Sequence, residues 1–234
     1  MRENEEWLLG GAWAPITDKV LFVQATAEQV AEGFHRSARG QHIRSALKHD
    51  YIAENLAVST LADAFAALVP LHGPVPLKHL IVPTTSRWTA IFIPTPSPDL
   101  GSEGVWMRSV GFPTVLISHA WTDATERGGG SRAIYFWPEA STQVAFGAAA
   151  RQDDNARWTF EESPLGWPGE RPWDPYARFA RNRFTRKHLE TAAEDIGIRF
   201  NKEDFYAPRS SILLLETGGI YANHQEFPMP RRAH

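Results

Sequence analysis

The side chains best suited to chemistry in this sequence are the cations of one segment in its last third. Asp174 and Pro175 suit the start of a helix, and no acidic residue follows them before Glu190. The cations between them are Arg178, Arg181, Arg183, Arg186 and Lys187. Guanidinium groups bind carboxylates and phosphates through paired N–H donors. The segment therefore predicts a site for an anionic group of a ligand or of a partner protein.

The apolar residues of this segment cannot all lie on one face of a single straight helix. At about 100° per residue, Tyr176, Phe179 and Phe184 point away from Leu189 and from the apolar residues that follow it. One helix could not bury both groups against the same core. We therefore predict that the helix breaks near Phe184.

The predicted break gives the second helix a cationic first turn. Thr185 becomes the N-cap of that helix, and Gly197 ends it. Arg186, Lys187 and His188 then occupy the first turn, where the helix dipole favours acids. Free backbone N–H groups, the threonine hydroxyl and these cations predict a site for a carboxylate or phosphate. The alternative is that acidic residues of the same chain neutralise the cations.

Tryptophan is abundant, with nine in 234 residues, and two of these stand just before the cationic segment. Trp167 and Trp173 stand among prolines and glycines in residues 163–175, a loop whose length favours a functional role. Because tryptophan and arginine are enriched in binding hot spots, we predict a binding surface that joins this loop to the helix pair. The predicted binding residues are Trp167, Trp173, Arg183, Thr185, Arg186, Lys187 and His188. The alternative for the two indoles is packing flat on the core.

A second chemistry is suggested by Ser118 and His119, at the end of a predicted strand, with Asp123 close behind. A histidine near a carboxylate can act as a general base. The alternative function is therefore an enzyme that hydrolyses a small anionic substrate in an aromatic-lined cleft, with His119 and Asp123 as catalytic residues. The sequence contains neither a Gly-x-Ser-x-Gly nor a His-Glu-x-x-His motif. A hydrogen-bonded histidine at a strand end is the simpler interpretation.

Metal and cofactor sites find no support in the sequence. His35, His42 and His49 recur every seven residues, a rise of about 10.5 Å on a helix, which is too far for two imidazoles to share one ion. The chain has no cysteine, and its triple glycine lacks the Lys-Ser/Thr of a phosphate-binding loop. We predict no metal and no cofactor.

The elements that must position these groups begin with a strand and a helix. Residues 20–23 are a buried strand pattern, and Thr26 with Gln29 forms a capping box for a helix that Gly40 ends. Residues 59–70 predict a second helix. The later chain is rich in β-branched and aromatic residues. Strands are predicted over 77–82, 88–93, 113–117, 133–137, 143–146, 157–160 and 212–215, with a short helix over 102–110.

This pattern predicts an α+β fold, a single domain over residues 1–234 in which several helices pack on a mixed, largely antiparallel sheet. Residues 222–234 could form a mobile tail. The net charge of −3 disfavours nucleic acid, and no apolar run approaches the ~20 residues that span a bilayer. The acidic N-terminus and the lack of cysteine favour the cytoplasm. We therefore predict a non-enzymatic protein-binding module, an inhibitor, an immunity-type protein or a regulatory partner.

Overall fold

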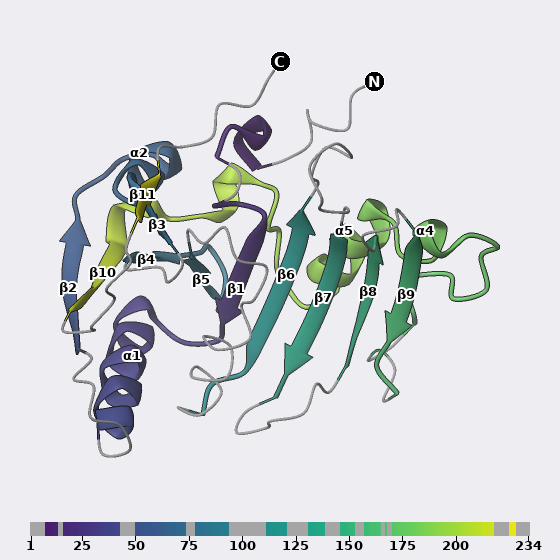
Figure 1. Ribbon diagram of the computed structural model, residues 1–234, viewed down its shortest axis with the longest axis horizontal. Coiled ribbons are helices and arrows are strands. Elements are labelled where there is room, and N and C mark those ends of the chain that lie inside the picture. The colour runs from purple at the N-terminus through teal and green to yellow at the C-terminus, as the bar shows by residue number, and fades with distance from the viewer. Residues whose placement is uncertain are drawn as a thin grey trace.

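A nine-stranded antiparallel sheet dominates the computed structural model (Figure 1). The structure describes residues 8–13, 16–42, 50–73, 78–93, 111–120, 131–138, 146–152, 157–164, 167, 170–217 and 225–227. It is 40% strand and 26% helix. The predicted α+β fold with helices packed on a mixed sheet was therefore wrong. The sheet is the main element, and all strand pairs in the described ranges are antiparallel.

The strand order of the large sheet is β2-β10-β4-β5-β1-β6-β7-β8-β9. Its strands are β1 (Lys19–Val23), β2 (Asp50–Leu56), β4 (Lys78–Pro83), β5 (Thr89–Phe92), β6 (Thr114–Ala120), β7 (Ser131–Trp137), β8 (Phe146–Gln152), β9 (Trp158–Glu162) and β10 (Ser211–Thr217). From β6 to β9 the strands follow chain order, whereas β10 returns to lie between β2 and β4. A second sheet pairs β3 (Leu71–Gly73) with β11 (Gln225–Phe227), so the predicted tail includes a strand.

The helices of the described residues lie on both faces of the sheet. They are α1 (Ala27–His42), α2 (Leu61–Ala66), α4 (Ala180–Arg183) and α5 (Arg186–Asp195), with 3-10 turns η2 (Leu8–Gly11), η3 (Glu203–Phe205) and η4 (Pro208–Ser210). No helix in the part of the chain that the structure describes is long and apolar enough to cross a membrane.

Successive side chains of each strand point to opposite faces of the sheet, so apolar residues form two cores, one on each face. Val20 and Phe22 of β1 contribute to the core that receives α2 and α5. Leu21 and Val23 contribute to the opposite core, which receives the apolar face of α1. α1 contacts β2, β4 and β10, at the end of the sheet opposite to β9. α4 and α5 contact β7, β8 and β9, so the predicted cationic segment lies at the β9 end (Figure 1).

The predicted start of α1 is confirmed by hydrogen bonds. The Thr26 N–H donates to Gln29 Oε1 at 2.9 Å and the Gln29 N–H donates to Thr26 Oγ1 at 3.3 Å, as the capping box requires. α1 continues two residues past the predicted end at Gly40. Thr60 caps α2 by accepting the Asp63 N–H at 3.1 Å, and α2 ends at Ala66, so this helix is shorter than the one predicted over 59–70. The predicted helix over 102–110 lies outside the described residues.

Candidate functional site

Trp167 and Trp173, predicted as binding residues, are buried in the core beneath α4 and α5. Their exposed fractions are 8% and 4%. Their ring centroids lie 5.4 Å apart, at an interplanar angle of 69°. Burying a large indole removes much apolar surface from water, which stabilises this packing. The prediction that these two side chains lie on the surface was wrong. The alternative, packing on the core, is what the structure shows.

The two indoles belong to a continuous series of aromatic rings, which we call the aromatic ladder. Phe136 and Phe146 stack at 4.5 Å on the sheet, and Phe146 meets Trp167 edge-on at 5.5 Å. At the other end, Trp173 meets Phe184 at 5.5 Å and 84°. The ladder therefore connects β7 and β8 to the junction between α4 and α5. It also fixes both ends of residues 174–183, because these residues run from Trp173 to Phe184.

The predicted break in the helical segment is confirmed. α4 and α5 are separated by the fully buried Phe184, whose φ and ψ of −135° and 89° are not helical. Thr185 is the N-cap of α5, and Gly197 follows its end with a positive φ of 82°. The predicted helix start at Asp174 was wrong. The Asp174 carboxylate instead accepts the Tyr176 N–H at 2.9 Å in a local turn.

Groups of the same chain occupy the predicted anion site. Thr185 Oγ1 accepts the His188 N–H at 3.3 Å, and the Thr185 N–H donates to His188 Nδ1 at 3.2 Å. Arg186 Nε donates to Glu190 Oε1 at 2.8 Å, and Asn201 donates to the same oxygen at 2.8 Å. For Arg186 the alternative interpretation is therefore confirmed, because an acidic residue of the same chain neutralises its charge.

The other two predicted cations differ in environment. Lys187 is exposed and has no acidic partner among the residues with described positions. Arg183 is partly buried, and its Nε donates to the Ala177 carbonyl at 2.9 Å. Arg183 thus holds the loop together, and its role in binding remains a prediction.

The N-cap of α5 provides a first test of this local structure. Replacing Thr185 with alanine is expected to lower the free energy of unfolding by about 1 kcal/mol, because a helix N–H loses its acceptor. Thr191→Ala is the matched control, since Thr191 is exposed within the same helix. Urea denaturation measures both variants. Equal stabilities for the two variants would contradict the capping role.

The surface of this region is formed by residues 174–183, which we call the arginine loop. Its ends meet through the aromatic ladder, as in the compact Ω-loops that often carry function. Tyr176 is 89% exposed and Phe179 is 52% exposed. Among described residues the third exposed large apolar side chain is Ile52, which lies on β2 at the opposite end of the sheet. Large exposed apolar groups gathered on one loop indicate a contact surface.

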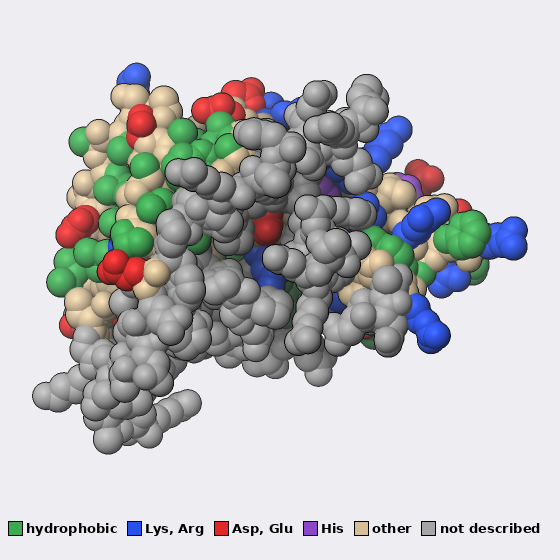
Figure 2. All heavy atoms as spheres, turned by 45° about the horizontal axis from the view of Figure 1, so that its top comes forward, with side chains coloured by type: hydrophobic (Ala, Val, Ile, Leu, Met, Phe, Trp, Pro, Cys, Tyr) green, Lys and Arg blue, Asp and Glu red, His purple; other side chains and the backbone are tan. Residues whose placement is uncertain are grey.

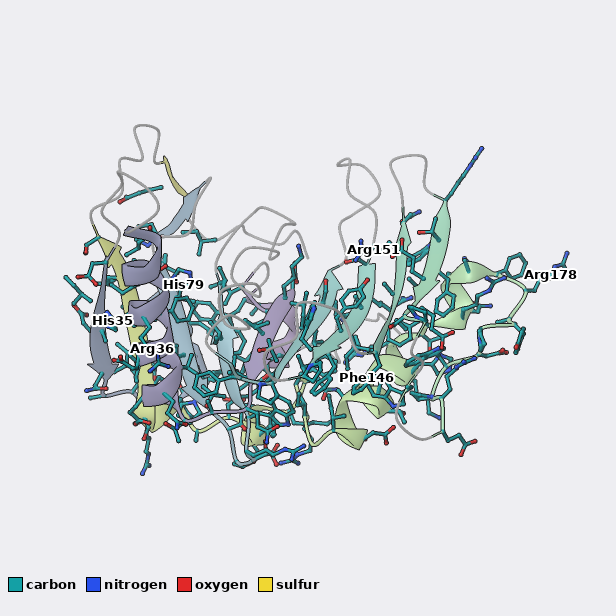
Figure 3. All side chains as sticks on the ribbon, turned by 90° about the horizontal axis from the view of Figure 1, so that it is seen from below. His35, Arg36, His79, Phe146, Arg151 and Arg178 are labelled. Atoms are coloured by element: carbon teal, nitrogen blue, oxygen red, sulfur yellow. The ribbon has the colours of Figure 1, made fainter. Side chains whose placement is uncertain are left out.

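Two arginines flank the exposed phenyl ring of the arginine loop. The guanidinium carbons of Arg178 and Arg181 lie 5.3 and 5.8 Å from the centroid of Phe179. Neither arginine has an acidic partner within the described ranges. Figure 2 shows apolar side chains ringed by cations at this end of the molecule, and Arg178 points away from the sheet in Figure 3.

The base of the arginine loop is held by an ion pair. Arg171 Nε lies 2.8 Å from Glu162 Oε1, which joins the incoming chain to the end of β9. With the Arg183–Ala177 bond and the buried Trp173 and Phe184 rings, this contact leaves the loop few ways to rearrange. An ordered loop loses less conformational entropy when it binds.

The structure places His119 opposite Arg132, on adjacent strands β6 and β7. Burial, together with the smaller effects of the Arg186 and Arg132 charges, lowers the pKa of His119 from 6.5 to about 3. A histidine with this pKa is neutral at pH 7 and accepts protons weakly, which disfavours it as a general base. Asp123, its predicted partner, lies outside the described residues. Within the described part of the chain, acidic and histidine side chains form no group that could hold a metal ion.

The exposed aromatic residues of the site were not predicted from the sequence. Tyr176 and Phe179 were assigned to the apolar face of a helix, because their spacing matches a helical period. Residues 174–179 form no helix, so the helical spacing of these two rings does not place them against the core. Comparisons with protein-family models, with curated proteins and with solved structures found no match, so the candidate site is defined by its geometry alone.

Proposed function

We propose that this chain is a non-enzymatic, cytoplasmic protein-binding module that contacts its partner through the arginine loop. An inhibitor, an immunity-type protein and a regulatory partner all act in this way. The observation that carries the proposal is the pair of exposed rings, Tyr176 and Phe179, beside Arg178 and Arg181. Tyrosine and arginine are among the side chains that dominate binding energy at protein interfaces.

The energetics favour a protein as the partner. Covering Tyr176 and Phe179 removes apolar surface from water, which stabilises a complex by roughly 25 cal/mol for each Å². The loop projects from the β9 end of the sheet, where Arg178 points outward (Figure 3). Small-molecule sites are instead concave and enclose their ligand. A projecting loop with aromatic and cationic side chains fits a protein surface better.

Site-specific photo-cross-linking tests the proposal. A photoreactive phenylalanine analogue at Tyr176 is expected to form a covalent adduct with one protein in cells that express the chain. The same analogue at Ile52 is the matched control, because Ile52 is 51% exposed but lies on β2 at the opposite end of the sheet. Gel shifts and mass spectrometry identify the adducts.

A second variant separates binding from chance proximity. Replacing Phe179 with alanine in the chain labelled at position 176 is expected to reduce the adduct at least about tenfold, as for a hot-spot residue worth over 1.4 kcal/mol. The proposal fails if positions 176 and 52 give the same adducts, or if removing the Phe179 ring leaves the adduct unchanged.

A further inference from the structure

We infer that the arginine loop recognises neighbouring carboxylates that border an apolar hollow on the partner. This inference rests on the proposed function and specifies the chemistry of the surface that the loop contacts. It uses the shape of the loop, the charges on it and the geometry of guanidinium groups. Each of these observations narrows the class of partner.

The shape of the loop favours a concave partner. At 89% exposure the Tyr176 ring stands almost clear of its own chain. A flat surface would cover only one side of such a ring. A hollow can cover it on several sides and exclude water around it, which is how hot-spot residues gain most of their energy.

The charges of the loop favour an acidic partner. The one acid in the loop, Asp174, accepts a backbone N–H from Tyr176. The cation at the base, Arg171, is already paired with Glu162. Arg178 and Arg181 therefore leave the loop with uncompensated positive charge, and a partner with carboxylates near the hollow would balance it.

Carboxylates fit this surface better than the phosphates of nucleic acid or of a lipid bilayer. The whole chain carries a net charge of −3, which opposes approach to an extended polyanion. A guanidinium that lies over a ring can still use its in-plane N–H groups for a carboxylate, in a paired geometry that lysine cannot reproduce. The Phe179 ring thus supports Arg178 and Arg181 as hydrogen-bond donors to carboxylates.

Fluorescence anisotropy with defined probes tests this inference. The probe is a fluorescein-labelled peptide with the sequence Gly-Glu-Leu-Glu-Glu-Leu-Gly, in which the leucines supply the apolar contact for Tyr176 and the glutamates supply the carboxylates. The comparison peptide has glutamine in place of each glutamate. The full-length chain is expected to bind the glutamate peptide at least about tenfold more tightly. The binding should weaken as salt is raised, because the contacts are exposed charges.

Variants locate the binding on the loop. Arg178→Glu with Arg181→Glu is expected to abolish binding of the glutamate peptide. Arg87→Glu with Arg209→Glu changes the net charge equally at two exposed arginines outside the loop, and should bind like the original chain. Arg178→Lys with Arg181→Lys keeps the charge but loses the paired donors, and is expected to bind about fivefold more weakly.

Several results would overturn the inference. They are no saturable binding of the glutamate peptide, equal binding by the lysine variant, or loop-dependent binding that is tighter to a phosphoserine peptide or to phosphatidylglycerol–phosphatidylcholine vesicles. The proposed function is judged separately by the adduct at position 176. An adduct there, with no binding of the glutamate peptide, would retain the protein partner and reject the carboxylate chemistry.

Discussion

Replacing Trp173 with alanine is expected to lower the free energy of unfolding by about 3–5 kcal/mol, as large-to-small changes at buried aromatic residues do. Trp173 is 4% exposed and contacts both Trp167 and Phe184 in the aromatic ladder. Its removal leaves a cavity and also frees the start of the arginine loop. Urea denaturation measures the loss.

The matched control for this change lies within the loop. Phe179→Ala removes an aromatic ring that is 52% exposed, so its effect on unfolding should stay within about 0.5 kcal/mol. Hydrogen exchange adds a local measurement. The Asn182 N–H, which donates to the Phe179 carbonyl at 2.9 Å, should exchange faster in the Trp173 variant. A loss below about 1 kcal/mol for Trp173→Ala would contradict the anchoring role of the ladder.

The features that the sequence predicted well are those with a local physical cause. The helical phase of Tyr176, Phe184 and Leu189 indicated a break, and α4 and α5 are indeed separated at Phe184. The capping side chains of Thr26 and Thr185 were likewise identified, because an N-cap bonds a backbone group only a few residues away.

The dominance of the sheet was not predictable from local patterns. β8 contains three successive alanines, which lack the branched side chains typical of strands, and only Phe146 of it was predicted. β2 was missed entirely, because its position at the sheet edge leaves most of its side chains exposed. Both strands are set by pairing with distant neighbours, and such pairing leaves no period in the sequence.

The candidate site differs from the binding surface predicted from the sequence. Arg178 and Arg181 belong to the segment that was expected to bind an anionic group, whereas the predicted binding residues Trp167 and Trp173 are buried. Loops have no period that indicates which ring is buried, so Trp173 was assigned to the surface and Tyr176 to a helix face. Only the packing against Phe184 decides between them.

A second large effect is expected from acid, through a histidine in the core beside α1. His79 is 1% exposed, and its ring lies 5.1 Å from that of Phe34 and 5.8 Å from that of Tyr51 (Figure 3). Neither of its ring nitrogens has a hydrogen-bond partner among the groups that the structure describes. Burial lowers the pKa of His79 from 6.5 to about 4, because the charged imidazolium would lose its hydration there.

The sign of the effect follows from the two protonation states of His79. Between pH 6.5 and about 4 the unfolded chain binds this proton and the folded chain does not. The contribution of neutral His79 to the free energy of unfolding is therefore fully present above pH 6.5. It falls as the pH is lowered to about 4, and below that pH His79 adds no further loss. The resulting loss in the free energy of unfolding between pH 6.5 and about 4 amounts to about 3 kcal/mol, at about 1.36 kcal/mol for each pH unit. His119 acts in the same direction, since its pKa is also lowered.

Two substitutions at His79 separate titration from the cost of its unpaired nitrogens. His79→Leu removes both, so it should reduce the acid loss by about 3 kcal/mol and also raise the stability at pH 7.5 by about 1–3 kcal/mol. His79→Asn removes the titration but retains an unpaired polar group, so it should reduce the acid loss without that gain. Urea denaturation from pH 4 to 7.5 measures both variants. If both variants lost stability in acid as steeply as the original chain, His79 would not be the group that titrates.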